Sequence, residues 1–209
     1  MLGLGWDRGS DSLRRMGMER VIVAGISGSG KTTMATALAA RLGLPRTELD
    51  ALYHGPKWVK RSEFEDDVAQ FTAEPRWVCE EQYFSTLGGL LWARADTLVW
   101  LDLPRRTVMW RVVRRSVLRV VTRQQLWNGN RETLREFLFD PEHPMRWAWT
   151  RHAVRRGAIG ERLAAHPDLV AVRLRNPREV RRWLRDLQNN SGRSVGGDGD
   201  GPSRTESAC

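Results

Sequence analysis

The chain has 209 residues, of which 41% are hydrophobic and 28% charged, and this favours a single substantial core over two independent domains. It contains no run of eighteen apolar residues, and its first seventeen residues lack the apolar centre of a secretory signal, so we expect a cytoplasmic protein without a membrane span. The formal charge of +9 comes almost wholly from arginine and by itself is compatible with nucleic acid, a membrane surface or an anionic small substrate.

Both ends of the chain have the composition of unstructured segments. Residues 1–17 are polar and include four glycines, and residues 189–209 contain no apolar stretch to bury. We therefore expect one folded domain over residues 18–188, with a disordered segment on each side.

The first expected element is a strand at residues 21–24, a wholly apolar run that leads into a glycine-rich loop. The loop reads GISGSGKT over residues 25–32, and apolar residues then recur at helical spacing as far as Gly43, a residue suited to a helix C-terminus. The backbone N–H groups of such a loop bind phosphate, and the following helix turns its positive end toward the anion. The pattern therefore predicts a site for ATP with Mg²⁺.

Within this loop the spacing assigns a contact to each polar side chain. Lys31 should reach the β and γ phosphates as a catalytic residue, Thr32 should bind the Mg²⁺ that bridges them, and Thr33 should touch the α phosphate. The complete set expected to bind the nucleotide within the loop is Gly25, Ser27, Gly28, Ser29, Gly30, Lys31, Thr32 and Thr33.

Three further expected strands, at residues 47–50, 76–80 and 97–102, each end in an acid. Ligands of open α/β sheets lie at the carboxyl ends of the strands. We assign Glu80 to the metal and Asp50 to the phosphoryl acceptor, and the alternative for both is an acid that only ends a strand in solvent. Asp102 precedes Leu-Pro and is expected to be a turn residue.

Between the first two of these strands, Ser62 to Glu65 resembles a capping box that opens a helix.

The next expected helix, residues 105–123, contains seven arginines and no acid. We interpret it as part of a lid, at about residues 105–150, in which Arg111 and Arg115 neutralise the transferring phosphoryl group. A solvated face and a nucleic-acid-binding stripe are the alternatives. Tryptophans in residues 127–132 and 146–149 are interpreted as packing for the lid.

The last expected strand, residues 169–174, is followed by a helix with Asn176 as N-cap and Pro177 as first residue. Five strands that alternate with helices predict an α/β fold, specifically the three-layer sandwich of P-loop NTPases with a five-stranded parallel sheet and helices on both faces.

In their order along the chain, these segments resemble the adenylate-kinase-like P-loop NTPases of bacteria, a group often described as AAA-type ATPases or DNA topology modulation proteins. The matching segments are VIVAGISGSGKTT, LDALY at residues 49–53, RWVCEEQY at 76–83, RADTLVWLDLP at 94–104 and the arginine helix. The resemblance implies that Asp50 lies near the acceptor, that arginines around Arg111 to Arg115 belong to the lid, and that Arg175 and Asn176 lie near the adenine. Residues 80–83 read EEQY where relatives commonly have Asp-Gly-Asn-Tyr, which does not favour adenylate kinase activity itself.

The sequence thus predicts a kinase that transfers the γ-phosphoryl group of Mg-ATP to a small acceptor held between Asp50, Tyr83 and the lid arginines. The alternative is an NTP-dependent regulatory protein, or ATPase, that contacts nucleic acid or a protein partner.

Overall fold

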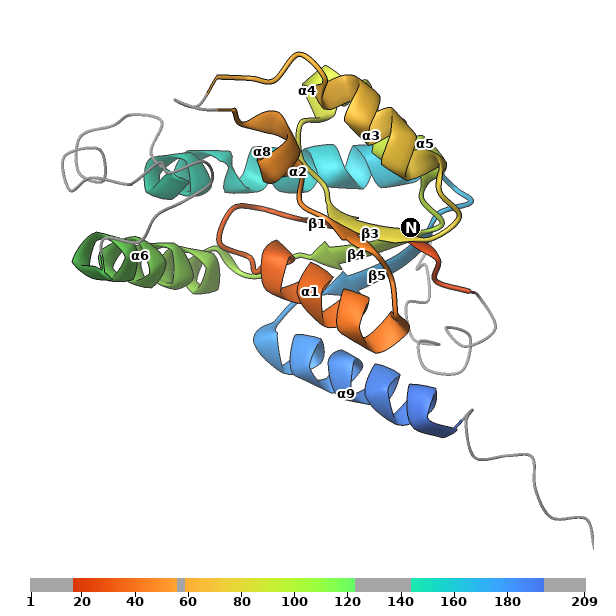
Figure 1. The fold of residues 1–209 in the computed structure, drawn as a ribbon. Coiled ribbons are helices and arrows are strands. Elements are labelled where there is room, and N and C mark those ends of the chain that lie inside the picture. The colour runs from red at the N-terminus through yellow and green to blue at the C-terminus, as the bar shows by residue number, and fades with distance from the viewer. Residues whose placement is uncertain (1–16, 56–58, 123–143, 194–209) are drawn as a thin grey trace, which may run out of the picture.

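A computed structural model describes residues 17–55, 59–122 and 144–193 (Figure 1). The described residues form one five-stranded sheet in the order β2-β3-β1-β4-β5, and every neighbouring pair of strands is parallel. The strands are β1 (Arg20–Gly25), β2 (Arg46–Thr47), β3 (Trp77–Glu80), β4 (Thr97–Leu101) and β5 (Val170–Leu174). The predicted five-stranded parallel sheet is confirmed.

Helices cover both faces of this sheet, as the sequence predicted (Figure 1). One face packs against α1 (Lys31–Leu42), α9 (Pro177–Arg193) and the first half of α6 (Arg105–Thr122). The other face packs against α2 (Leu49–Tyr53), α3 (Phe64–Ala73), α4 (Phe84–Leu87), α5 (Leu90–Arg94) and α8 (Pro144–Ala164). None of the helices that the structure describes has both the length and the apolar character needed to cross a membrane.

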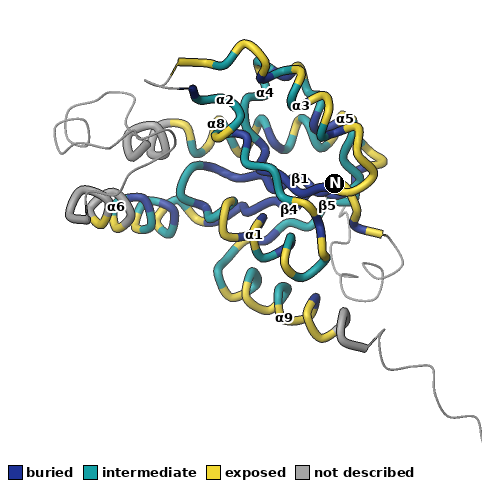
Figure 2. The backbone as a smooth tube through the Cα atoms, in the orientation of Figure 1, coloured by how far each residue is buried: buried dark blue, intermediate teal, exposed yellow. Residues whose placement is uncertain are grey.

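The central strand β1 shows why its sequence is apolar throughout. Val21 and Val23 point into the core on the α1 side, whereas Ile22 and Ala24 point into the core on the α8 side, because successive strand residues face opposite ways. All four are fully buried, and the central strands are buried along their length in Figure 2. This burial holds the glycine loop at the carboxyl edge of the sheet.

The prediction of a second strand at residues 47–50 is wrong in its extent. β2 is the edge strand and pairs with β3 only through Arg46 and Thr47. The chain then turns into α2, where Leu49 is buried against the helices of the α8 side. Asp50 consequently lies in the first turn of a helix and not at a strand end.

The two predicted helix starts have different outcomes. The capping box at Ser62 is wrong: α3 begins at Phe64, its N-cap is Glu63, and the Ser62 hydroxyl donates to the Glu63 carboxylate at 3.0 Å. The cap at Asn176 is confirmed, because its Oδ1 accepts from the backbone N–H groups of Arg178 and Glu179, both at 3.0 Å. The helix that it opens continues to Arg193.

Candidate active site

The glycine loop joins β1 to α1 in a tight backbone turn. Ser29 N–H donates to Ile26 O at 3.0 Å, and the backbone is left-handed at Gly28 (φ 81°) and at the helix N-cap Gly30 (φ 99°). Side chains are strained at such φ values, so glycine is the residue that fits.

Helix α6 packs directly on this loop. A Cβ atom at Gly28 would lie 2.3 Å from Val112 Cγ2, so only glycine permits the approach of the helix. Arg111 Nη1 donates to Ser29 O at 2.8 Å, which fixes the predicted lid arginine at the loop. The backbone of Arg115 lies in the same helix, but its side chain lies outside the described part of the structure.

Lys31 is the first residue of α1 and is surrounded by charge. Removal of its ammonium group from water lowers the pKa of Lys31. The carboxylate of Glu80 raises this pKa in part, whereas the positive charge of Arg155 on α8 lowers it further. Glu81 and Asp50 also act on its charge. The lysine therefore lies where β3, α2 and α8 converge on the loop.

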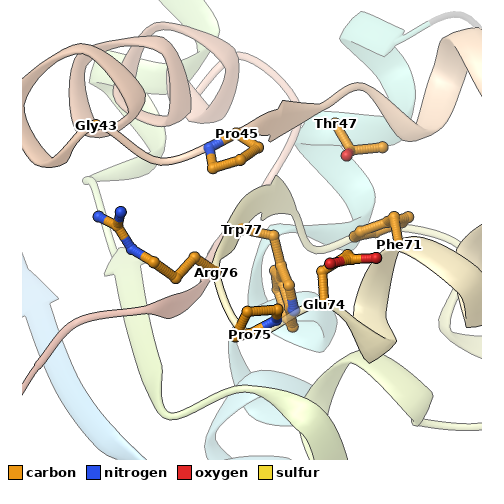
Figure 3. Close-up of a pocket in the computed structure, with 8 residues that line it drawn as sticks. All are labelled: Gly43, Pro45, Thr47, Phe71, Glu74, Pro75, Arg76 and Trp77. Carbon is orange, nitrogen blue, oxygen red and sulfur yellow. The ribbon is translucent and has the colours of Figure 1, made fainter.

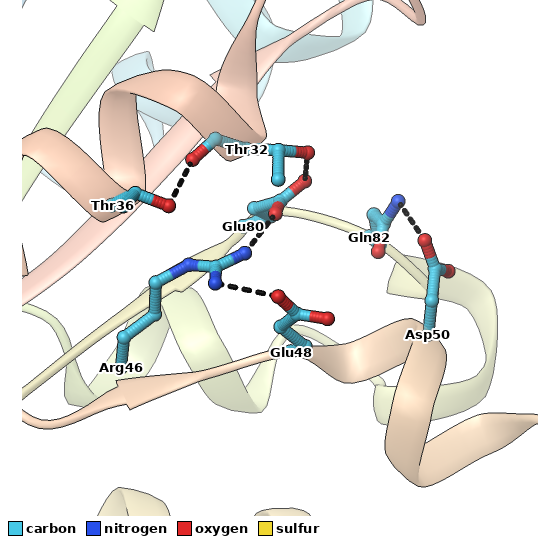
Figure 4. A network of polar contacts seen from close by, with 7 residues as sticks. All are labelled: Thr32, Thr36, Arg46, Glu48, Asp50, Glu80 and Gln82. Carbon is cyan, nitrogen blue, oxygen red and sulfur yellow. Dashed lines mark hydrogen bonds and ion pairs between the residues drawn. The ribbon is translucent and has the colours of Figure 1, made fainter. Parts of the chain in front are cut away.

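Glu80, at the end of β3, connects α1 to the sheet edge (Figure 4). Its Oε2 accepts from the Thr32 hydroxyl at 3.1 Å, and its Oε1 accepts from Arg46 Nη2 at 3.3 Å. Arg46 also donates to Glu48 at 2.5 Å. The two residues that the sequence assigned to the metal are therefore in direct contact, with Glu80 buried and Thr32 exposed.

Asp50 is surrounded by polar side chains from the segment that follows β3. The Tyr83 hydroxyl donates to Asp50 Oδ1 at 2.6 Å, and Gln82 Nε2 donates to Oδ2 at 3.3 Å (Figure 4 shows the Gln82 contact). His54 Nε2 lies 3.2 Å from the same tyrosine hydroxyl. Burial, followed by the hydrogen bond to Asp50, raises the pKa of Tyr83, so the hydroxyl stays protonated as a donor.

Aromatic rings hold Tyr83 in this position. It stacks on Tyr53, with ring centroids 4.1 Å apart and planes inclined by 12°, and meets the edge of Phe64 at 5.2 Å. Tyr83 is also the one described non-glycine residue with a positive φ, at 53°. Such a backbone is strained for a bulky residue, and positions of this kind cluster at functional sites.

The arginines of α8 that contact Glu81 were missed by the sequence analysis. Glu81, with 1% of its side chain exposed, accepts from Arg162 Nη1 at 2.8 Å and from Arg155 Nη2, and Trp92 Nε1 lies 3.4 Å from the same carboxylate. The signal available in the sequence was a second acid directly after Glu80 at the end of an apolar strand, which requires a positive partner if it is buried.

Asp102 is more than the turn residue that was expected. It follows β4 and is buried, and its carboxylate pairs with Arg156 at 2.9 Å and with Arg173 at 2.7 Å. It thereby joins α8 to β5. Arg175, at the carboxyl end of β5, is exposed, and its backbone N–H donates to Glu179 at 2.6 Å. The contact of Arg175 with adenine stays a prediction.

A surface cavity of about 440 Å³ lies at the opposite edge of the sheet, where β2 and β3 begin (Figure 3). Its lining includes Pro45, which precedes β2, and Pro75 and Trp77 at the start of β3. None of the predicted site residues belongs to its lining. The site assembled around Lys31 is therefore separate from this cavity.

No protein-family model matches the sequence, and no curated protein matches it either. Among solved structures, a gluconokinase from Sinorhizobium meliloti 1021 is 19% identical, with a TM-score of 0.46 over 87% of this chain and 98% of that chain. A shikimate kinase from Acinetobacter baumannii in complex with shikimate is 13% identical, with a TM-score of 0.44 over 88% of this chain and 94% of that chain. A sugar kinase from Janibacter sp. HTCC2649 is 17% identical, with a TM-score of 0.39 over 85% and 94%. These similarities are distant, and membership of the adenylate-kinase-like group stays a prediction.

Proposed function

We propose that the protein is an ATP-dependent phosphotransferase that moves the γ-phosphoryl group of Mg-ATP to a hydroxyl of a small acceptor. One observation favours this function most: the Thr32–Glu80 contact and the Asp50–Tyr83 contact lie side by side at the end of β3. A donor site needs a hydroxyl and a carboxylate near the metal, and an acceptor site needs a carboxylate near the attacking oxygen. Both pairs are held by the same four-residue segment.

On the donor side, the glycine loop would hold the phosphates through its backbone N–H groups, with Lys31 on the β and γ phosphates. The Thr32 hydroxyl and the Glu80 carboxylate fit Mg²⁺, which prefers oxygen ligands and is usually bound through one or two carboxylates together with phosphates and water. When bound, Mg²⁺ supplies charge neutralisation between the β and γ phosphates. Arg46 pairs with the Glu80 oxygen that Thr32 does not contact, and so orients the carboxylate.

On the acceptor side, Asp50 would accept the proton of the attacking hydroxyl or orient it by a hydrogen bond. Tyr83 and Gln82 each donate to a different oxygen of this carboxylate, so its direction is fixed before the acceptor binds. Arg111, which is anchored to the loop, and Arg115 would neutralise the charge of the transferring group.

The proposal is tested by ADP release from Mg-ATP across a panel of sugars, polyols, nucleosides, nucleotides and hydroxy acids. We expect at least one acceptor to accelerate ADP release, and Lys31→Ala to abolish the acceleration. A flat panel with slow hydrolysis that is the same in Lys31→Ala would disprove a kinase.

One observation favours the second candidate, an NTP-dependent protein that contacts nucleic acid. The outer face of α9 presents exposed arginines for which the described part of the structure shows no ion pair, and these are Arg178, Arg181, Arg182 and Arg185. If all four bind phosphates, the logarithm of DNA affinity should fall with the logarithm of salt with a slope of about −3.6. Fluorescence anisotropy of labelled DNA, with the four arginines changed to glutamine, measures this; absence of DNA binding at low salt removes the candidate.

A further inference from the structure

His54 caps the C-terminus of α2 and follows Asp50 by four positions, a step that brings two side chains to neighbouring places on a helix. Its backbone N–H donates to Asp50 O at 3.1 Å. On its other side, His54 forms a β-bridge with Lys60, and Gly55 N–H donates to Val59 O at 2.7 Å. The backbone of His54 is therefore held from both directions.

The Tyr83 hydroxyl lies between the side chains of Asp50 and His54. Its oxygen is 2.6 Å from Asp50 Oδ1 and 3.2 Å from His54 Nε2. Tyr83 reaches this place with a left-handed backbone and with its ring stacked on Tyr53. The His54 ring in turn meets the Tyr53 ring edge-on, with centroids 5.0 Å apart. These polar groups form a row that ends at the carboxylate of the proposed acceptor site.

The donors and acceptors of this row fix where each hydrogen lies. An ionised carboxylate has no hydrogen to give, so the 2.6 Å contact requires the Tyr83 hydroxyl to donate to Asp50. Burial, followed by this hydrogen bond, raises the pKa of Tyr83, so the hydroxyl keeps its hydrogen. A tyrosine hydroxyl has a single hydrogen, and the side of its oxygen that faces His54 must accept. His54 Nε2 therefore carries a hydrogen and donates it to Tyr83.

This hydrogen bond restricts the direction of the Tyr83 hydroxyl. A hydroxyl hydrogen rotates toward whichever neighbour accepts it, and an unprotonated Nε2 of His54 would compete with Asp50 for it. With Nε2–H in that place, Asp50 is the one of these two neighbours that can accept. A hydroxyl that accepts a hydrogen bond is also a stronger donor, because hydrogen bonds in a chain polarise one another. Asp50 is then held at Oδ1 by Tyr83 and at Oδ2 by Gln82.

We infer that His54 is a positioning residue: its Nε2–H group donates to Tyr83, directs the tyrosine hydroxyl to Asp50, and so keeps this carboxylate in one orientation for the attacking hydroxyl of the acceptor. The place of the hydrogen on Nε2 follows from the contacts alone. The effect on phosphoryl transfer rests on the proposed kinase function, in which Asp50 accepts or orients the proton of that hydroxyl. His54 acts through Tyr83 and is not assigned a contact with the acceptor.

The hydrogen on Nε2 is tested without any substrate, by ¹⁵N NMR of the histidine rings at about pH 8.5, where an imidazole in water is neutral. Comparison with His54→Gln identifies the signals of His54. We expect its Nε2 to carry the hydrogen. His166 is the opposite reference, because its Nδ1 lies 2.7 Å from Arg162 O and a carbonyl only accepts. A neutral His54 ring with the hydrogen on Nδ1 would overturn the inference.

The positioning role is tested by two substitutions that place an amide differently. Gln can bring an amide N–H to the place of Nε2, whereas Asn is one carbon shorter and cannot. With an acceptor that accelerates ADP release, we expect His54→Asn to lower kcat about 10-fold at unchanged Mg-ATP affinity, and His54→Gln to recover most of this loss. His166→Gln is the control for loss of a histidine outside the site and should leave kcat unchanged.

A double-mutant cycle separates positioning through Tyr83 from a general structural role. Tyr83→Phe removes the hydroxyl, so His54→Asn in that background should lower kcat by no more than about 2-fold. A further loss of about 10-fold there would refute the inference, as would equal losses for His54→Asn and His54→Gln in variants that fold by circular dichroism.

The outcomes keep this inference apart from the proposed function. If no acceptor accelerates ADP release, the kinase function fails and the positioning role fails with it, whereas the ¹⁵N spectrum still decides whether His54 donates to Tyr83. If an acceptor is found and the spectrum or the cycle gives the contrary result, the inference fails and the kinase function stands. Should His54→Asn not fold, the ¹⁵N spectrum of the wild type decides.

Discussion

At the scale of single residues, the candidate site is organised by carboxylates that are each held by at least two hydrogen-bond donors. Glu80 accepts hydrogen bonds from α1 and β2, Glu81 accepts two from α8, and Asp50 accepts two from the segment that follows β3. Carboxylates that are held from several sides keep one orientation, and this preorganises a site for charge that develops during a reaction. Two residues of this arrangement are energetically unfavourable: Lys31, because its charge is removed from water, and Tyr83, because its backbone has a positive φ.

Lys31 is expected to destabilise the protein in the absence of nucleotide. Burial lowers the pKa of Lys31 below its ordinary value of 10.5, so the folded chain holds the charge less readily than the unfolded chain. Lys31→Met should raise the free energy of unfolding at pH 7 by roughly 1 kcal/mol and abolish Mg-ATP binding. Thermal unfolding with and without Mg-ATP measures both effects.

The pH dependence has a defined sign. Below the lowered pKa, Lys31 is protonated in both the folded and the unfolded chain, and the full free-energy cost of burying its charge applies. Between that pKa and 10.5 the folded chain releases the Lys31 proton, so this cost falls. The difference between Lys31→Met and wild type should therefore shrink as the pH rises toward 10.5. A variant that is less stable than wild type at pH 7 would contradict this account.

Tyr83 is expected to act through its hydroxyl. Tyr83→Phe keeps the stacking on Tyr53 but removes the 2.6 Å hydrogen bond to Asp50, and should lower kcat about 10- to 100-fold and the free energy of unfolding by about 1–2 kcal/mol. Tyr53→Phe is the matched control, because no contact of its hydroxyl is found among the described residues. Equal effects of the two substitutions would show that the hydrogen bond is not the cause.

At the scale of elements, the glycine loop and α6 form one unit. Gly28 contacts α6 at Val112, and Arg111 of the same helix donates to Ser29 O. Helix α6 also packs against α8, which provides Arg155 and Arg162. The position of the loop is therefore coupled to both arginine-bearing helices.

Substitution of Gly28 tests this coupling. Gly28→Ala should destabilise the protein by more than Gly43→Ala, because both residues have a positive φ but only Gly28 is in contact, its added Cβ lying 2.3 Å from Val112 Cγ2. The shared backbone strain costs about 1–2 kcal/mol. Val112→Ala added to Gly28→Ala should recover part of the excess. Denaturant unfolding of wild type, the two single variants and the double variant measures the free energies of unfolding. Equal losses of this free energy for Gly28→Ala and Gly43→Ala would disprove the contact.

At the scale of the whole molecule, the sheet and its helices could be predicted because the strands are short apolar runs that alternate with amphipathic segments. The extent of β2 could not be predicted, since an edge strand of two residues pairs on one side only, and Leu49 is buried as part of a helix instead. The Thr32–Glu80 pair was predictable from strand ends and loop chemistry. The arginines of α8 were not, because their partner Glu81 is 74 residues away in sequence from Arg155.

The central claim is that the glycine loop and the Asp50 cluster belong to one phosphoryl-transfer site. The most direct measurement follows the γ-phosphorus of Mg-ATP by ³¹P NMR in the presence of an acceptor that accelerates ADP release, for wild type and Asp50→Asn. The account predicts a phosphate ester with wild type, and with Asp50→Asn a rate of ester formation lower by about 100-fold or more at unchanged Mg-ATP affinity. Inorganic phosphate as the sole product of both proteins would contradict it.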